Sequence, residues 1–296
     1  MSLHPALVAA GIDLLIFDMD GVLVDVADSY RAAIVGTVQI YVRDVARLDP
    51  PGEARVTSEA VAAWKAAGGF NNDWDLSAGL AGAVICGADL LDTAREIAQS
   101  GGGLAGLEAA LGRVATASVR YNGDVGDPHD IKRVFQELYL GGPRFKAATG
   151  LLPCHVALES PGLCDREVAI LSPDACRSIA AEIPVAIATG RPADEAADAL
   201  DRLGTRALFP VVITDDDVRA ESRRSGLPFA QVAKPSAWPL QEARRRAAPG
   251  AKRAAYVGDL ADDMAAADAA RMFSIGVGDP PPLGAQLALR HPDLLL

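Results

Sequence analysis

Hydrophobic and polar positions divide the chain into three stretches with different periodicities. A short apolar run at 12–17 ends in acidic residues and a glycine, which predicts a buried strand followed by a sharp turn. From about residue 26 to 165, apolar positions recur at helical spacing and show almost no strand pattern. From about residue 168 onward, short apolar runs alternate with helical segments. This order predicts an α/β fold with a doubly wound parallel sheet, interrupted by an all-α segment.

The same pattern sets the expected boundaries. We expect residues 1–25 and 166–296 to form the α/β core and residues 26–165 to form an inserted α-helical domain. Besides the first run, strands are expected at 183–188, 209–214, 254–257 and 273–277. Core helices are expected at about 194–203, 236–247 and 261–270. In the insert, helices are expected after Asp28 or Ser29, at about 58–67, from near Trp74 and from Asp127-Pro128.

The composition of the chain argues against some classes of binding partner. Of the 296 residues, 50% are hydrophobic, so the chain can bury a sizeable core. The formal net charge of -11 argues against a nucleic acid or an anionic membrane as the main partner, whereas a local cation would still permit a phosphorylated small molecule. The N-terminal residues lack the basic start of a secretory signal, and the apolar stretch 76–91 is too short to span a bilayer. The four cysteines form no C-x-x-C pair. We therefore expect a cytoplasmic protein with reduced thiols.

The end of the first strand carries the clearest chemical signal. Asp18 and Asp20 follow the apolar run, and Gly21 lets the chain turn away. In an open α/β sheet, ligands bind outside the carboxyl ends of the strands, so both carboxylates are expected where a ligand would lie. Two like charges side by side are costly unless a cation or protons intervene, which indicates a divalent-metal site. An ordinary strand end with an Asp-Gly turn would give the same short pattern.

Three further polar clusters follow later predicted strands. Thr189-Gly190-Arg191 offers a hydroxyl and free backbone N–H groups, which can cradle a phosphate. Lys234 precedes a predicted helix and supplies a compact positive charge. Asp259, Asp262 and Asp263 repeat the crowding of carboxylates, and Mg²⁺ would relieve it at both strand ends. Taken singly, the clusters have simpler interpretations: a helix cap, a surface lysine and acidic residues at a helix N-terminus.

In their order along the chain, the clusters resemble the four motifs of the haloacid dehalogenase superfamily. These stand here as FDMDGVLVD, IATGRP, KPS and VGDLADDM, and the resemblance covers about residues 8–25 and 168–285. It implies that Asp18 is the nucleophile, that Asp20 is the general acid/base, and that Thr189 and Lys234 hold the phosphoryl group. It also implies Mg²⁺, held directly or through water by Asp18, Asp20, Asp259 and Asp263. The helical insert resembles the cap of phosphoglycolate phosphatase-like members, although it is long for that class.

Residues that contact the rest of the substrate are expected at two places. Next to Thr189, Gly190 and Arg191 are candidate substrate-binding residues, although Arg191 could instead form an ion pair at the surface. In the insert, a polar cluster precedes Trp74 and would read the leaving group; its members are Asn71, Asn72 and Asp73. The alternative for this cluster is a helix-capping loop with Trp74 in the core of the insert.

The sequence therefore predicts an Mg²⁺-dependent phosphatase that hydrolyses a small phosphorylated metabolite through an aspartyl-phosphate intermediate. A carboxylate such as Asp18 is already ionised at neutral pH and needs no separate base to attack phosphorus. Asp20 would protonate the leaving oxygen and later take a proton from the hydrolytic water. A phosphomutase of the β-phosphoglucomutase type shares all four motifs and stays open as an alternative. A non-catalytic phosphometabolite-binding protein is the alternative from another class, and the intact motifs argue against it.

Overall fold

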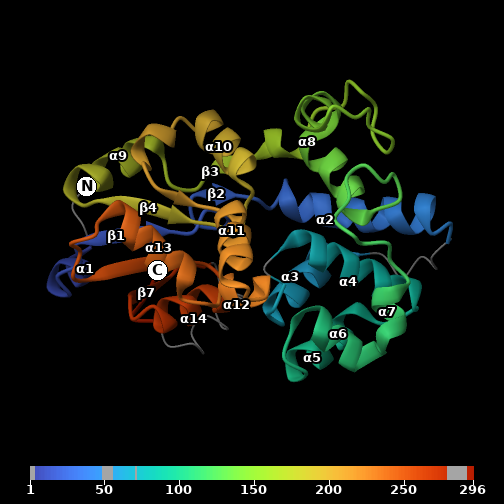
Figure 1. Ribbon diagram of the computed structural model, residues 1–296, viewed down its shortest axis with the longest axis horizontal. Coiled ribbons are helices and arrows are strands. Elements are labelled where there is room, and N and C mark those ends of the chain that lie inside the picture. The colour runs from blue at the N-terminus through green and yellow to red at the C-terminus, as the bar shows by residue number, and fades with distance from the viewer. Residues whose placement is uncertain (1–3, 49–55, 71, 279–291) are drawn as a thin grey trace. The chain divides into compact units, whose positions relative to one another are not determined.

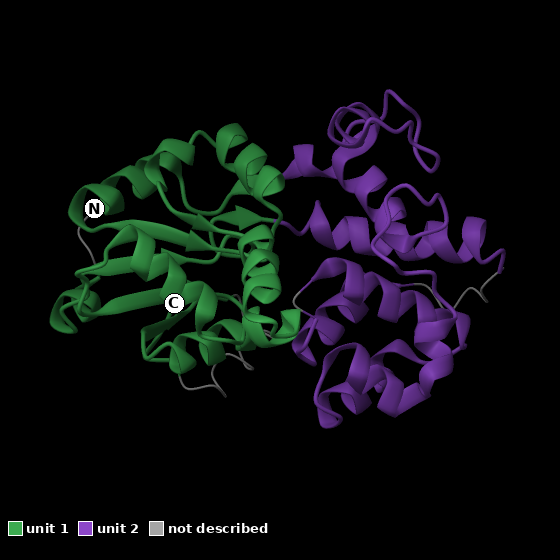
Figure 2. Ribbon diagram, in the orientation of Figure 1, with its two compact units in different colours: residues 1–25, 168–296 green, residues 26–167 purple. Residues whose placement is uncertain are grey.

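The chain folds into two compact units. The computed structural model describes residues 4–48, 56–70, 72–278 and 292–296. Unit 1 comprises Met1–Asp25 and Val168–Leu296, and unit 2 comprises Val26–Glu167 (Figure 2). Unit 1 is thus assembled from two separate segments of the sequence, and unit 2 is one continuous insertion between them.

Unit 1 is built on a six-stranded sheet with the order β5-β4-β1-β6-β7-β8 (Figure 1). The strands are β1 (Leu14–Phe17), β4 (Val185–Ala188), β5 (Val212–Ile213), β6 (Ala254–Gly258), β7 (Phe273–Gly276) and β8 (Leu294–Leu295). Every pair of neighbours is parallel. Strands β1, β4 and β6 are buried along their whole length, as expected of parallel strands covered on both faces. The predicted doubly wound α/β fold is confirmed, and β1 is the strand on whose two sides the chain order diverges.

The helices of unit 1 lie between and around these strands. They are α1 (Pro5–Ala9), α9 (Pro173–Glu182), α10 (Ala193–Arg202), α11 (Asp215–Ser225), α12 (Phe229–Val232), α13 (Trp238–Ala247) and α14 (Ala261–Ala269), with a 3₁₀ turn, η3, at Arg206–Leu208. Alternate strand residues such as Leu14 and Ile16 pack with Leu240 of α13 and Ala266 of α14 in one buried cluster. Burial of this apolar surface is the main driving force that holds the sheet against these helices.

Among its described residues, the regular secondary structure of unit 2 is helical. Its helices are α2 (Tyr30–Ile40), α3 (Ser58–Ala66), α4 (Asp73–Ile85), α5 (Leu90–Gln99), α6 (Gly103–Leu111), α7 (Arg113–Ala117) and α8 (Ile131–Thr149), with a π-helical turn, η1, at Tyr41–Val45 and a 3₁₀ turn, η2, at Leu163–Arg166. Every residue of α4 from Leu76 to Val84 is buried, which makes α4 the central helix of the unit. No helix among the described residues combines the length and apolarity that a bilayer span requires.

One predicted helix start and one predicted helix cap in unit 2 need correction. Helix α8 begins at Ile131 rather than at Asp127-Pro128, because Asp130 is the N-cap residue and its Oδ1 accepts a hydrogen bond from the Lys132 N–H at 2.9 Å. Helix α2 begins at Tyr30, as predicted, but Ser29 makes no side-chain cap. The Ser29 hydroxyl donates instead to Glu167 Oε1 at 3.1 Å.

A short antiparallel pair of strands joins the two segments of unit 1, at the points where the chain leaves for unit 2 and returns from it. The sequence pattern did not predict this pair. β2 (Val24–Asp25) pairs antiparallel with β3 (Val168–Ala169), so that Val24 faces Ala169 and Asp25 faces Val168. The point where the chain leaves unit 1 and the point where it returns therefore lie side by side. Two-residue strands carry too few positions for a period-two pattern, which also explains why β8 was not predicted.

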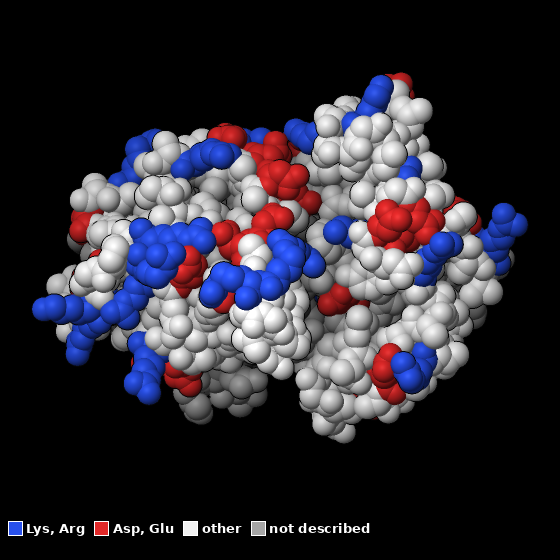
Figure 3. Space-filling view, in the orientation of Figure 1, with Lys and Arg blue, Asp and Glu red and all other residues white. Residues whose placement is uncertain are grey.

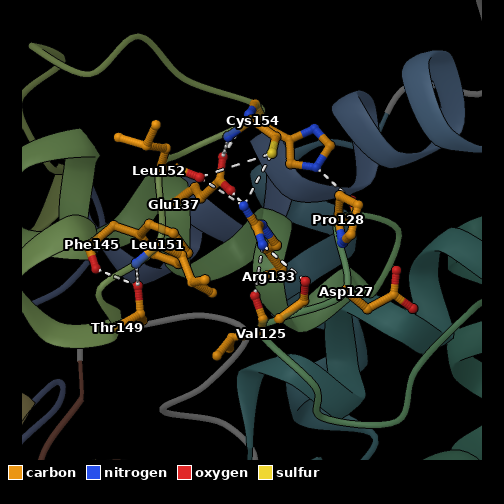
Figure 4. A network of polar contacts seen from close by, with 12 residues as sticks. Val125, Asp127, Pro128, Arg133, Glu137, Phe145, Thr149, Leu151, Leu152 and Cys154 are labelled. Atoms are coloured by element: carbon orange, nitrogen blue, oxygen red, sulfur yellow. Dashed lines mark hydrogen bonds and ion pairs between the residues drawn. The ribbon is translucent and has the colours of Figure 1, made fainter.

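A buried ion pair holds the loops that flank α8 (Figure 4). Arg133 and Glu137 pair at 2.7 Å with 5% and 0% of their side chains exposed. Arg133 also donates to the carbonyl oxygens of Val125 at 3.0 Å and Leu152 at 2.8 Å. Glu137 Oε2 accepts from the Cys154 N–H at 2.7 Å. One buried pair thus fixes both the segment before α8 and the segment after it.

Arg133→Met is expected to lower the free energy of unfolding by about 3 kcal/mol, because it leaves the Glu137 carboxylate buried without its cation. The double variant Arg133→Met/Glu137→Met should lose less, since no unpaired charge stays buried. Denaturant unfolding measures both. Arg95→Met is the control: Arg95 pairs with Asp92, both side chains are mostly exposed, and the change should be below about 0.5 kcal/mol. An equal loss in Arg133→Met and Arg95→Met would contradict this account of the buried pair.

Basic side chains on the surface of unit 1 have acidic neighbours. Figure 3 shows Lys and Arg interspersed with Asp and Glu on the visible face. On α11, Arg224 pairs with Glu221 at 2.7 Å, and on α13 both Arg245 and Arg246 pair with Glu242 at 2.6 Å. These contacts offset the charge of the arginines. Because the side chains of Arg224 and Arg245 are largely exposed, their pairs contribute little to stability.

Candidate active site

Asp18 and Asp20 lie at the carboxyl end of β1, in the middle of the sheet. The Asp18 N–H donates to the Val257 carbonyl at 2.8 Å, which extends the β1–β6 ladder and fixes the backbone of Asp18. The Asp18 side chain is buried, whereas 30% of the Asp20 side chain is exposed. Gly21 turns the chain with a φ of +72°, and a Cβ at this position would lie 2.1 Å from Asp259 Oδ2. Glycine is therefore required here for both its φ and its size.

Three buried carboxylates meet at this end of the sheet. Asp259 follows β6, and Asp263 lies in the first turn of α14. Together with Asp18 they present carboxylate oxygens that all lie within 4.8 Å of one another. Asp263 Oδ2 also accepts a hydrogen bond from the Leu260 N–H at 3.0 Å, which fixes its orientation at the start of the helix. Three of the four predicted metal ligands are thus brought together, and the Asp20 carboxylate lies outside this cluster.

Lys234 faces the acidic cluster. It lies between α12 and α13, and its Nζ is 2.7 Å from Asp263 Oδ1 and 3.1 Å from Asp18 Oδ1. Burial opposes the charge on Lys234, but the carboxylates of Asp18 and Asp263 outweigh it and raise the lysine pKa well above its usual value. Burial raises the pKa of Asp18 to about 7, although Lys234 acts in the opposite direction. Lys234 is therefore a permanent cation beside a carboxyl group that titrates near neutrality.

Thr189 and Gly190 lie at the end of β4, the strand next to β1. The Thr189 N–H donates to the Ile213 carbonyl at 2.9 Å, which continues the β4–β5 ladder. The Thr189 Oγ1 accepts a hydrogen bond from the Arg191 N–H at 3.2 Å, which closes a tight turn around the exposed Gly190. Adjacent parallel strands place their carboxyl ends together, so Thr189 and Asp18 belong to one edge of the sheet.

Arg191 forms a buried ion pair with Asp20 rather than a surface pair. Its Nε and Nη2 lie 2.8 and 2.6 Å from Asp20 Oδ1, and only 1% of its side chain is exposed. The two residues are 171 positions apart in the sequence, so no local pattern could reveal the pair. Direct contact between Arg191 and a substrate stays a prediction.

Tyr256 is a site residue that the sequence pattern did not single out. It lies on β6 within the apolar core, and its hydroxyl accepts a hydrogen bond from Lys234 Nζ at 2.9 Å. The same hydroxyl lies 3.2 Å from the Ala188 carbonyl and 3.1 Å from Asp263 Oδ1. Burial, together with the charges of Asp18 and Asp263, raises the pKa of Tyr256 well above its usual value, so the hydroxyl keeps its proton. The only sequence signal was a tyrosine in an otherwise apolar strand.

The family model of the haloacid dehalogenase-like hydrolases matches residues 12–271, which is most of the chain. The chain belongs to the haloacid dehalogenase-like hydrolase family.

The chain is also similar to one longer protein of known sequence and to several proteins of known structure. An imidazoleglycerol-phosphate dehydratase from Phytophthora nicotianae is 27% identical over 274 residues, which cover 92% of this chain and only 44% of that protein. The phosphatase Tt82 from Thermococcus thioreducens is 23% identical, with a TM-score of 0.58 over 87% of this chain and 88% of that chain. A predicted phosphoglycolate phosphatase from Haemophilus somnus is 16% identical, with a TM-score of 0.54 over 96% of this chain and 93% of that chain. The two structures share the fold of this hydrolase.

The donor set of this hydrolase fits a hard divalent cation. Carboxylate oxygens are the ligands that Mg²⁺ and Ca²⁺ prefer, and Asp18, Asp259 and Asp263 supply them from three positions at one end of the sheet. Asp20 adds a fourth carboxylate, whereas Lys234 and Arg191 are the basic side chains paired with this group. When all are ionised, the acidic groups outnumber the basic ones, so a divalent cation would lower the electrostatic free energy of the site.

The polar cluster at the start of α4 is a helix cap. Asn72 is the N-cap residue of α4, and its Oδ1 accepts hydrogen bonds from the N–H groups of Trp74 and Asp75 at 2.9 Å each. Asp73 pairs with Lys65 at 2.9 Å. Asn71 lies outside the described residues. Asn72 thus makes the capping contacts of the alternative interpretation, and a role of Asn72 or Asp73 in reading a leaving group stays a prediction.

Proposed function

We propose that this protein is an Mg²⁺-dependent phosphatase that hydrolyses a phosphate monoester of a small metabolite. The observation that carries the proposal is the buried cluster of Asp18, Asp259 and Asp263, in which Lys234 pairs with Asp18 and Asp263. A carboxylate nucleophile beside a lysine and a cation site has the parts that phosphoryl transfer needs, since that chemistry depends on positioning and on neutralising charge.

The first half of the proposed reaction transfers the phosphoryl group to Asp18. A carboxylate oxygen of Asp18 attacks phosphorus, the bond from phosphorus to the leaving oxygen breaks, and an aspartyl phosphate forms. Asp20, which carries a proton at the start of the cycle, gives it to the leaving oxygen, so that the metabolite departs as an alcohol. Asp20 suits this role because it is partly exposed, while Arg191 holds its carboxylate in place.

The second half returns the enzyme to its starting state. Asp20, now ionised, takes a proton from a water molecule that attacks the phosphorus, and inorganic phosphate leaves Asp18. The hydroxyl of Thr189, the N–H of Gly190 and the ammonium of Lys234 are proposed to donate hydrogen bonds to the phosphoryl oxygens. Thr189 can do so because its Oγ1 accepts from the Arg191 N–H and keeps its own proton to donate.

Mg²⁺ is proposed to be held by Asp18, Asp259 and Asp263, with Asp20 as the remaining candidate ligand. When bound, it supplies the positive charge that offsets the repulsion between the Asp18 carboxylate and a phosphate dianion. Unit 2 (Val26–Glu167) is proposed to be the cap that determines substrate specificity, because the roles proposed for the groups of unit 1 concern only the phosphoryl part and the leaving oxygen of a substrate.

The proposal is tested by phosphate release from a panel of phosphorylated metabolites, with Mg²⁺ and with excess EDTA. The panel should include imidazoleglycerol phosphate, because the relative from Phytophthora nicotianae is named for it. Turnover of at least one compound that stops with EDTA and returns with Mg²⁺ is the expected result. If no compound releases phosphate although calorimetry shows that Mg²⁺ binds, the proposal of hydrolysis is contradicted. Phosphoryl transfer or a binding role would then be the better explanation of the site.

Mg²⁺ is expected to raise the melting temperature more at about pH 8 than at about pH 5.5. The folded-state pKa of Asp18 is about 7, above its ordinary value of 3.8, so folding of the metal-free protein takes up a proton between these values. Its stability therefore falls as the pH rises through that window. A cation must displace the Asp18 proton below pH 7, which weakens the apparent affinity roughly tenfold per pH unit.

Thermal unfolding at both pH values, with and without Mg²⁺, measures this effect. Na⁺ at equal ionic strength serves as the control for general screening. Equal Mg²⁺-induced shifts at both pH values would show that Asp18 is not a ligand that loses its proton on binding.

A further inference from the structure

The hydroxyl of Tyr256 is not needed for packing. The ring lies in the apolar core of unit 1 with Leu14, Ile16 and Ala186, and it is fully buried. Phenylalanine would fill this space equally well, whereas a buried hydroxyl must find hydrogen-bond partners to offset the loss of hydration. Tyr256 finds them among groups of the candidate active site, which indicates that its hydroxyl serves that site.

Lys234 has three N–H donors, and its ammonium makes three contacts with side chains of the candidate active site. They run to Asp18 Oδ1 at 3.1 Å, to Asp263 Oδ1 at 2.7 Å and to the Tyr256 hydroxyl at 2.9 Å. The first two acceptors are charged and belong to the proposed metal site, so a cation competes with Lys234 for them. The Tyr256 hydroxyl is neutral and belongs to a core strand, so it is the acceptor that a cation leaves in place.

The hydroxyl can serve Lys234 in both states because its single proton has two acceptors. It lies 3.1 Å from Asp263 Oδ1 and 3.2 Å from the carbonyl of Ala188, the last residue of β4, which Thr189 follows. Rotation of the O–H bond moves the proton from one acceptor to the other without moving a heavy atom. The oxygen lone pair that accepts from Lys234 is available in either case.

We propose that Tyr256 is a positioning residue that holds the Lys234 ammonium beside Asp18 before and after a cation binds. The inference rests on the proposed function, because Lys234 is the group that then stabilises charge on the phosphoryl oxygens. Without the hydroxyl, one N–H of Lys234 loses its neutral acceptor. The position of the ammonium then depends on which of the two carboxylates, Asp18 or Asp263, is not occupied by the cation. Transition-state stabilisation then falls, while binding of the cation does not depend on Tyr256.

Tyr256→Phe tests the proposal, with Tyr41→Phe as the matched control. Tyr41 is also buried and its hydroxyl accepts one hydrogen bond, from the Arg120 N–H at 2.7 Å in unit 2. In Tyr256→Phe, kcat for the best substrate is expected to fall about fivefold to tenfold, the size expected for one lost hydrogen bond, with KM changed less than twofold. Affinity for orthovanadate, which resembles the phosphoryl-transfer transition state, should fall by the same factor. Both quantities should keep their wild-type values in Tyr41→Phe.

The Kd of Mg²⁺, measured by calorimetry, separates two ways in which the hydroxyl could act. It should stay within twofold of wild type in Tyr256→Phe. A weaker Mg²⁺ affinity, with kcat restored at saturating Mg²⁺, would show that the hydroxyl acts on Asp263 and would overturn the proposal. A wild-type kcat and vanadate affinity in Tyr256→Phe would overturn it as well.

A measurement on the wild-type protein covers the case in which Tyr256→Phe does not fold. The Lys234 ammonium is mostly buried and is expected to keep the Tyr256 hydroxyl as an acceptor when a cation competes for the carboxylates. Its protons should therefore exchange slowly and give a ¹⁵N–¹H signal both without and with Mg²⁺. Loss of that signal on addition of Mg²⁺ would overturn the proposal. Failure of the proposed function would be seen differently, as absence of phosphate release by the wild-type protein, and the vanadate, Mg²⁺ and ammonium measurements would still decide the role of Tyr256.

Discussion

Asp18→Asn is expected to reduce phosphate release by at least about 10³-fold, because an amide oxygen is a poor nucleophile and cannot form the aspartyl phosphate. The substitution keeps the shape of a side chain that is buried at the end of β1. The same change should raise the melting temperature of the metal-free protein at about pH 8. At that pH Asp18 is a buried carboxylate beside Asp263, and its pKa of about 7 shows that burial disfavours its charge.

Asp13→Asn is the control for this experiment. Asp13 lies just before the opposite end of β1, where its carboxylate accepts from the N–H groups of Lys252 at 2.8 Å and Arg253 at 2.9 Å. Loss of these contacts should cost some stability and leave kcat unchanged. Turnover by Asp18→Asn within tenfold of wild type would exclude Asp18 as the nucleophile, and the proposed mechanism would fall with it.

Arg191→Ala is expected to lower both stability and rate. Its guanidinium is almost fully buried, and Asp20 loses the partner that fixes its carboxylate. Breaking a buried ion pair costs about 3 kcal/mol, and this value lies at the lower end of the usual range because Asp20 is partly exposed and can take up water. Rate should fall up to about 10²-fold with an alkyl phosphate, the lower end of what general acid–base catalysis contributes.

The leaving group distinguishes a role through Asp20 from a general loss of structure. An aryl phosphate with an acidic phenol needs little protonation on departure, so Arg191→Ala and Asp20→Asn should both affect its rate less than that of an alkyl phosphate. Arg206→Ala removes an exposed pair with Asp201 and should change neither rate nor stability appreciably. If Arg191→Ala slowed both substrates equally, Arg191 would be assigned to phosphoryl binding or to folding rather than to Asp20.

Much of the fold and part of the site could be predicted from the sequence. The buried strands ending at Phe17, Ala188 and Gly258 are short apolar runs followed by polar residues, and parallel strands bring such ends together. That rule is sufficient to gather Asp18, Thr189 and Asp259 at one edge of the sheet. The starts of α3 and α4 were predicted to within one residue, because Thr57 and Asn72 are N-cap residues directly before a helical apolar pattern.

The rest depends on contacts between residues distant in the sequence. Nothing near Arg191 indicates that it pairs with Asp20, and nothing near Tyr256 indicates that its hydroxyl meets Lys234. The α8 boundary was misplaced because two aspartates, Asp127 and Asp130, are both good N-cap residues. Asp130 accepts from the Lys132 N–H as the cap and from the Asn122 N–H of the preceding loop. Such choices are made by packing and cannot be read from local propensity.

Because β2 and β3 pair side by side, the ends of the insertion that forms unit 2 lie close together on unit 1. Because Val24 and Ala169 are paired, a hairpin of a few residues could join them directly and leave the parallel sheet complete. The entropy of closing a loop grows only with the logarithm of its length, so inserts of very different size at this point cost the sheet nearly the same free energy. The segment between Val24 and Ala169 could therefore change in length or sequence while the sheet, and the candidate active site at its edge, stay the same.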